Sequence, residues 1–215
     1  RVPTPQRGDG PSRVLTAAAA VRTLPYWLIA AMFTISMANK EMAVLHLVPS
    51  GREAGLTAAA ATSLITLFGV TSIMAKLAIG YWADRAGPHR LYVASMAAQV
   101  AALLGLALGA GPVPFFAATA LLGFTYGGWV PLIPTMASLA FGTRHFGAIY
   151  GSLMVAATVG TMGGPLLGGA LFDLTGTYTA AYALLAVLAG GAALLGLTLL
   201  RLRPAPRPLA PSPWA

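Results

Sequence analysis

The chain has 215 residues, of which 57% are hydrophobic and only 8% are charged, and its formal net charge is +8. Soluble globular proteins carry about 25% charged residues, so this composition excludes a chain whose whole surface faces water and indicates one that lies in lipid. The sequence contains no cysteine, which excludes disulfides and thiolate metal sites.

The first part of the chain has the composition of a linker. Residues 1–13 are rich in proline, glycine and arginine, and residues 14–24 are short and mildly amphipathic. We expect residues 1–24 to form a cytoplasmic linker. Because residue 1 is arginine and no signal peptide follows it, we expect the chain to continue a longer protein.

Six apolar segments follow the linker, each 20 to 26 residues long, at 25–48, 57–80, 91–110, 114–139, 146–171 and 179–200. About 20 helical residues cross a hydrocarbon core of roughly 30 Å. The sequence therefore predicts an all-α membrane protein with a six-helix bundle over residues 25–200. Residues 201–215 are rich in proline and arginine and are expected to form a cytoplasmic tail.

Lysine and arginine are distributed unevenly between alternate loops. If the N-terminus is cytoplasmic, ten arginines lie inside, only Arg52 lies outside, and Lys40 and Lys76 fall within apolar segments. The positive-inside rule then places both termini in the cytoplasm, in a multi-pass protein of the cell (inner) membrane. Basic loops beside lipid phosphates account for the net charge, so we expect the lipid bilayer as a partner and no nucleic acid.

Two segments of the chain share a pattern. "GYWADRAG" (80–87) and "GALFDLTG" (169–176) both read G-x-x-x-D-x-x-G, with an offset of 89 residues. The first ends the second predicted helix, and the second ends the fifth on the opposite side of the membrane. The pattern predicts two inverted three-helix repeats, which are typical of secondary transporters. The alternative is that glycine and aspartate are simply common at helix ends.

The segment "GYWADRAGPHR" (80–90) resembles the loop motif of the major facilitator superfamily, G-x-L-A-D-R-x-G-x-x-R. The matching residues are Gly80, Ala83, Asp84, Arg85, Gly87 and Arg90. Trp82 replaces the usual leucine, and His89 occupies a basic position. In that family the loop joins the second and third helices of each six-helix half, which is its place here.

Two further stretches resemble monocarboxylate-type and oxalate:formate-type members of the family: "VRTLPYW" (21–27), the lead-in to their seventh helix, and residues 146–178, their eleventh helix and following loop. The resemblance implies the C-terminal half of a twelve-helix transporter, which moves a small solute such as a monocarboxylate or another organic anion by alternating access. It also implies a partner, either the missing N-terminal six-helix half or a second six-helix unit.

The loop at 80–90 is a candidate gate. Gly80 would let helices approach closely, and Gly87 would permit a tight turn. Asp84 can lie against a helix N-terminus, where the helix dipole favours an anion, and Arg85 and Arg90 can pair with carboxylates or lipid phosphates. Such a cluster can latch two helices in one conformation. The alternative is a basic loop that only anchors the helices.

The first apolar segment contains polar residues near its middle, where a charge costs at least about 2.5 to 3.5 kcal/mol. Asn39, Lys40 and His46 fall on roughly one helical face and are candidates to bind a polar or anionic substrate. Glu41 points about 100° away from Lys40, so both cannot occupy the centre of one cavity. Alternatively, Lys40 and His46 extend outward and Glu41 pairs locally. Lys76 is expected to extend to the cytoplasmic surface.

The fourth and fifth segments supply the remaining candidates. Tyr126 and Trp129 precede Pro131 and Pro134, which are expected to bend the helix. Both aromatic residues could line the cavity, although packing against neighbouring helices is the alternative. Thr161 could face the same cavity, or its hydroxyl could bond to its own helix.

The sequence contains no pattern typical of an enzyme. The three histidines lie in three different segments, and neither a nucleophile–base pair nor a glycine-rich phosphate loop is present. We therefore expect no catalytic residues, no metal and no cofactor. The alternative to a transporter is a six-helix membrane scaffold or subunit that transports nothing.

Overall fold

The computed structural model describes residues 16–109 and 111–202, and this part of the chain is helical, without strands. Most of the expected linker and tail lies outside the described residues. The helices are α1 (Ala17–Val21), α2 (Leu24–Glu53), α3 (Ala58–Ala86), α4 (Pro88–Leu108), α5 (Pro112–Trp129), α6 (Leu132–Phe141), α7 (Phe146–Thr175) and α8 (Thr179–Arg201).

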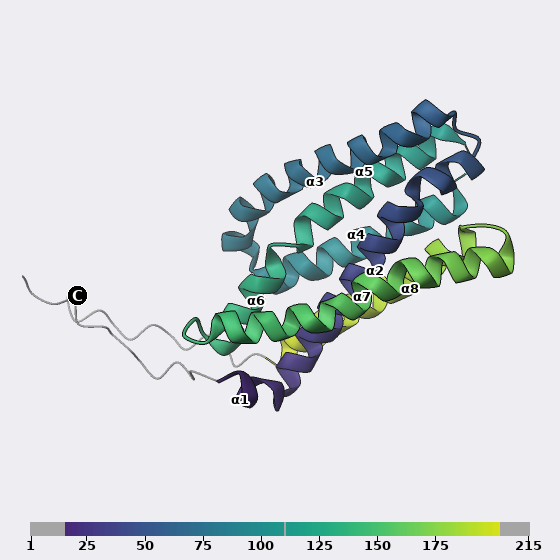
Figure 1. The fold of residues 1–215 in the computed structure, drawn as a ribbon. Helices are drawn as coiled ribbons and strands as arrows, with labels where there is room; N and C mark the ends of the chain where they lie inside the picture. Colours follow the sequence, from purple (N-terminus) through teal and green to yellow (C-terminus); the bar gives the residue numbers. More distant parts are fainter. Residues whose placement is uncertain (1–15, 110, 203–215) are drawn as a thin grey trace, which may run out of the picture.

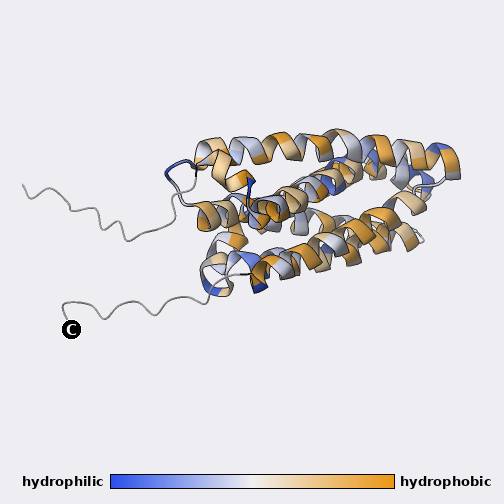
Figure 2. Cartoon of the chain, turned by 90° about the horizontal axis from the view of Figure 1, so that it is seen from below, coloured by the Kyte–Doolittle hydropathy of each residue, from blue (hydrophilic) through white to orange (hydrophobic). Residues whose placement is uncertain are grey.

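Six spans in the described residues are long and apolar enough to cross a membrane, because α5 and α6 together form a single span, Pro112–Phe141. Figure 2 shows apolar residues along the lengths of the helices and hydrophilic residues mainly at their ends. The predicted class, an all-α membrane protein with six transmembrane helices, is therefore confirmed.

The fourth span is interrupted where the sequence predicts a bend. α5 ends at Trp129 and α6 begins at Leu132. Pro131 lies between them and has no amide hydrogen to continue the helical ladder. The amide of Val130 still donates to the carbonyl of Tyr126, at 3.3 Å, so the interruption begins directly after this bond.

The helix pairing has the symmetry of an inverted repeat. The most extensive interfaces pair α2 with α7, α4 with α8 and α3 with α5. In the two triplets, α2 corresponds to α5–α6, α3 corresponds to α7, and α4 corresponds to α8. Under this correspondence the α3–α5 interface is equivalent to the α7–α2 interface, and the α4–α8 interface is equivalent to itself. Figure 1 shows α3 beside α5 and α7 beside α2. The predicted pair of three-helix repeats thus appears in the packing.

Glycines allow the backbones to meet at two of these interfaces. Those that contact a neighbouring backbone are Gly123, Gly127, Gly160 and Gly164. A Cβ atom at Gly160 would overlap the carbonyl oxygen of Thr34 on α2. A Cβ atom at Gly127 would overlap the carbonyl oxygen of Ser72 on α3. In lipid such close packing replaces the hydrophobic effect as the force that holds helices together.

Candidate functional site

Among the described residues, the charged side chains near the middle of a span belong to α2 and α3. Lys40 and Glu41 are residues 17 and 18 of the 30 in α2, and Lys76 is residue 19 of the 29 in α3. Elsewhere charges lie near helix ends, as with Asp173 in α7 and Arg201 in α8. Charge within the described spans is therefore concentrated on α2 and α3, where both helices reach Tyr126 of α5.

The ring of Tyr126 is the meeting point of these charges. The Lys40 Nζ lies 5.6 Å from the ring centroid and the Lys76 Nζ lies 5.3 Å from it. Both distances fall within the roughly 6 Å range of a cation–π interaction. Phe68 stacks on the ring at 5.4 Å, and Trp129 meets it edge-on at 5.6 Å. We call Lys40, Glu41, Lys76, Tyr126 and Trp129 the Tyr126 cluster.

An ion pair within the Tyr126 cluster leaves it with a single net positive charge. The Lys40 Nζ lies 2.7 Å from the Glu41 Oε1, and these side chains are 22% and 27% exposed. Glu41 thus pairs locally, which was one of the two alternatives for this residue. Lys76 is exposed and forms no ion pair with the described side chains. The sum of two ammonium groups and one carboxylate is +1.

The sequence analysis did not include Lys76 among the substrate-binding candidates, and it ended the second span before α3 ends. The hydropathy pattern ends near Gly80, whereas α3 continues to Ala86 and closes at Gly87. Lys76 is therefore ten residues from the end of its helix, about 15 Å at 1.5 Å per residue. The dipeptide Gly87–Pro88, with glycine as a helix stop and proline as a helix start, was the available signal for the true end.

The other polar candidates on α2 are directed at other helices. Asn39 is fully buried, and its Nδ2 donates to the carbonyl of Leu185 on α8 at 3.4 Å. The His46 Nε2 lies 3.2 Å from the carbonyl oxygen of Pro165 on α7, and its Nδ1 lies 3.2 Å from the Tyr178 hydroxyl. A carbonyl only accepts, so Nε2 carries the hydrogen and Nδ1 accepts from Tyr178. Both residues tie helices together.

Thr161 is a partly buried residue of α7. On the same helix, the hydroxyl of Thr158 donates to the carbonyl of Met154 at 3.0 Å, a bond of the kind that was the alternative for Thr161. Of the six predicted substrate-binding residues, the structure therefore brings Lys40, Tyr126 and Trp129 together, and it directs Asn39 and His46 elsewhere.

Of the two glycine roles predicted for the loop between α3 and α4, the structure has the tight turn at Gly87. Gly87 has a φ of +80°, which suits glycine and allows Pro88 to begin α4 directly. Gly176 has a φ of +73° and closes α7, so a glycine with positive φ ends both helices of the repeated pattern, although ψ is 143° at Gly87 and 3° at Gly176. The described helices make no close approach at Gly80, since a Cβ atom there would meet nothing within 4 Å.

The charged residues of this loop lie at the end of the bundle. The guanidinium of Arg85 lies 3.7 Å from the ring centroid of Tyr81, and Arg90 is exposed. His89 is buried, and the side chain of Asp84 is outside the described set. The role of this loop as a gate remains a prediction.

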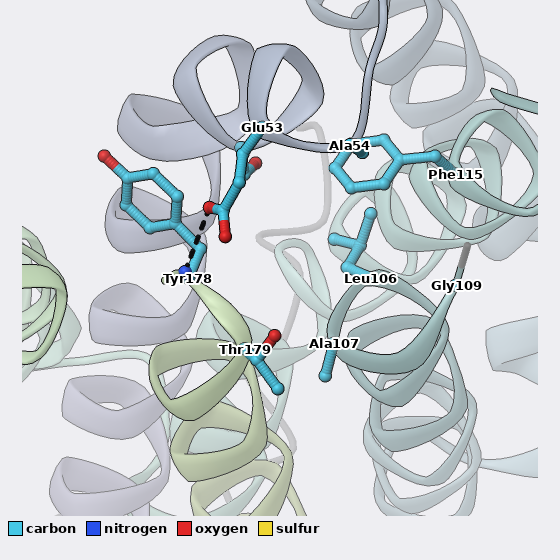
Figure 3. A pocket seen from close by; sticks show the side chains of 9 residues that line it. Glu53, Ala54, Leu106, Ala107, Gly109, Phe115, Tyr178 and Thr179 are labelled. Carbon is cyan, nitrogen blue, oxygen red and sulfur yellow. Dashed lines mark hydrogen bonds between the residues drawn. The ribbon is translucent and has the colours of Figure 1, made fainter. Parts of the chain in front are cut away.

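A small cavity of about 160 Å³ opens at the opposite end of the bundle, away from the Tyr126 cluster (Figure 3). Its wall includes Leu106 and Phe115 on one side and Glu53 and Tyr178 on another. The backbone amide of Tyr178 donates to the Glu53 Oε2 at 3.1 Å. Burial and the negative charges of Glu53 and Asp173 raise the pKa of the Tyr178 phenol.

Comparison with known proteins identifies relatives of this chain. The oxalate:formate antiporter of Oxalobacter formigenes is 29% identical over 163 residues, which cover 74% of this chain and 39% of the antiporter. Monocarboxylate transporter 9 of Rattus norvegicus is 32% identical over 121 residues, which cover 55% of this chain and 24% of that transporter. This chain thus spans well under half the length of either relative.

Solved structures give the same fold. The fucose:proton symporter FucP of E. coli superposes with a TM-score of 0.72 at 19% identity, over 85% of this chain and 45% of that chain. The family model described as Major Facilitator Superfamily matches residues 15–215. Because this match covers nearly the whole sequence, and the six spans and their pairing agree with it, the chain belongs to the Major Facilitator Superfamily.

Proposed function

We propose that this chain is the C-terminal half of a secondary transporter that moves a small carboxylate anion across the cell membrane by alternating access. The observation that carries the proposal is the Tyr126 cluster, in which two lysines from different helices, each within a span long enough to cross a membrane, meet one aromatic ring. One six-helix half supplies one wall of a transport pathway, so we expect a second half to supply the other.

The energetics of charge in lipid support an anionic substrate. A lysine near the middle of a span costs about 2.5 to 3.5 kcal/mol on insertion scales, and this cluster contains two. Glu41 offsets one of them, whereas Lys76 has no carboxylate partner among the described side chains. An anion from solution is the partner that this arrangement lacks. The aromatic faces beside the ammonium groups suit the short carbon skeleton of a small organic acid.

The names of the relatives agree with this class of substrate. One is named an oxalate:formate antiporter and another a monocarboxylate transporter, and both names refer to carboxylates. The identities to both relatives are modest, so the names support the chemical class and not a particular acid.

The test compares charge variants of both lysines in the complete transporter, using formate and lactate against their uncharged amides. Lys40→Gln and Lys76→Gln should each weaken carboxylate binding roughly 10- to 100-fold, the worth of a hydrogen bond to a charged group, and should barely change amide binding. Lys40→Arg and Lys76→Arg keep the charge and should restore part of the affinity. Equilibrium binding to purified protein gives these values.

Arg144→Gln is the matched control, because Arg144 is an exposed cation in the loop between α6 and α7. It should bind both ligand classes like the unaltered transporter. Equal losses for carboxylates and amides in the lysine variants would remove both lysines from the site. Absence of binding and uptake for every carboxylate would favour the scaffold alternative.

A further inference from the structure

The carboxylate of Glu41 is the one acidic group of the Tyr126 cluster. Resting on the proposed function, we propose that Glu41 sets the charge of the substrate: it holds the site at a net charge of +1 and so selects singly charged carboxylates over dicarboxylates. Its own position supports this, since its Oε1 lies 2.7 Å from the Lys40 Nζ while both side chains remain partly exposed.

No other charged residue in the described part of the chain contributes to the net charge of +1 at the Tyr126 cluster. Glu53 is the last residue of α2, and Asp173 lies two residues before the end of α7. α5, α6 and the middle of α7 and α8 carry no charged residues. Within the described residues, the charge at this depth is therefore set by Lys40, Glu41 and Lys76 alone.

The count predicts which anions fit. A monocarboxylate would bring the site from +1 to zero, whereas a dicarboxylate would bring it to −1. An uncompensated charge is costly in a medium of low dielectric constant, where interactions are only weakly screened. The second carboxylate would also approach Glu41 itself, and juxtaposed like charges disfavour binding. Glu41 thus acts by excluding the wrong ligand as well as by balancing Lys40.

Glu41 also competes with the substrate for Lys40. An ammonium group has three donors, and the ion pair at 2.7 Å occupies one of them. The two remaining N–H groups can donate hydrogen bonds to one carboxylate without breaking the pair. Lys76 carries no such internal partner, so it is the ammonium that binds a monocarboxylate most directly.

The experiment measures the ratio of oxalate to formate affinity in the complete transporter at neutral pH, where both carboxyl groups of oxalate are ionised. The unaltered protein should prefer formate and lactate. Glu41→Gln removes the negative charge, raises the site to +2, and should shift the ratio towards oxalate by at least about tenfold. Formamide, which is uncharged, should show no such shift.

Two further variants keep the result interpretable. Glu41→Asp retains a carboxylate and should keep the preference for monocarboxylates, which separates the effect of charge from any effect on folding. Asp173→Asn removes a carboxylate from an exposed position near the end of α7 and should leave the ratio unchanged.

The outcomes separate this inference from the proposed function. If the unaltered transporter binds oxalate as tightly as formate, or if Glu41→Gln leaves the ratio unchanged while the lysine variants abolish binding, the role of Glu41 is refuted and carboxylate transport stands. If the unaltered protein binds none of these acids, both proposals fail.

Discussion

Tyr126 brings together charges that reside on two other helices. It is residue 15 of the 30 in the bent span Pro112–Phe141, and its ring lies within 6 Å of the ammonium groups of Lys40 and Lys76. The face of an aromatic ring carries negative electrostatic potential, so the ring attracts both cations without neutralising either one. Two like charges can therefore remain near each other and stay available to a ligand.

We expect the ring of Tyr126, rather than its hydroxyl, to hold this arrangement. Tyr126→Phe keeps the ring and should bind formate nearly as well as the unaltered transporter. Tyr126→Leu removes the aromatic face, which is worth about 0.5 to 2 kcal/mol per cation, and should weaken formate binding roughly 3- to 30-fold. Equilibrium binding of formate distinguishes the two variants. Equal losses in both would assign the effect to the hydroxyl.

At the scale of helices, the packing depends on contacts that leave no room for side chains. Gly160 and Gly164 of α7 lie against the backbone of α2, whereas Gly151 of the same helix has open space where a Cβ atom would be. One helix therefore presents glycines that are required for packing and glycines that are not.

Gly160→Ala should destabilise the protein by about 1 to 3 kcal/mol, because the added methyl group overlaps the carbonyl oxygen of Thr34 and forces α7 away from α2. Gly151→Ala is the matched control on the same helix. It should be neutral or stabilising by about 0.5 to 1 kcal/mol, since alanine favours a helix and meets no neighbour there. Thermal unfolding in detergent measures both. Similar destabilisation by the two variants would contradict the close contact at Gly160.

The sequence predicts the existence of the spans better than it predicts where each helix ends or which side of it contacts a neighbouring helix. Apolar runs reveal six spans because side chains that face lipid must be apolar. Pro131 predicts the interruption before α6 because proline has no amide hydrogen to continue the helix. Helices, however, continue past the apolar run until a residue such as Gly87 stops them, so α3 extends beyond the end that hydropathy predicts. A span that is apolar on all sides also gives no indication of which face meets which neighbour.

The same limit applies to the candidate site. Lys40 could be recognised from sequence, because a charge inside an apolar run is conspicuous. The partners of Asn39 and His46 lie more than 110 positions away along the chain, on α8 and α7, and only the folded arrangement reveals them. Their polarity predicted a cavity, whereas both form interhelical hydrogen bonds.

At the scale of the whole molecule, alternating helices bring their basic residues to one end. The described arginines at the end that contains the α3–α4 loop are Arg22, Arg85, Arg90, Arg144 and Arg201. The opposite end has Arg52. By the positive-inside rule we expect the arginine-rich end to face the cytoplasm.

Single cysteines test this orientation without background labelling from this chain, because its sequence contains no cysteine. Thr143 and Thr177 are exposed residues in loops at opposite ends of the bundle. Thr177→Cys should react with a membrane-impermeant maleimide in intact cells, and Thr143→Cys should react only after the membrane is permeabilised. Labelling of Thr143→Cys from outside would invert the topology.

The burial of Trp129 gives the site an optical signal of its own. Trp129 is fully buried beside the Tyr126 ring, whereas Trp27 and Trp82 are each 58% exposed. Indole fluorescence shifts to shorter wavelength in apolar surroundings and responds to nearby charge. Of the tryptophans that the structure describes, Trp129 should therefore emit furthest to the blue and resist aqueous quenchers, and its emission should change when an anion settles beside the two lysines. The protein thus contains its own fluorescent reporter of whether the site is occupied.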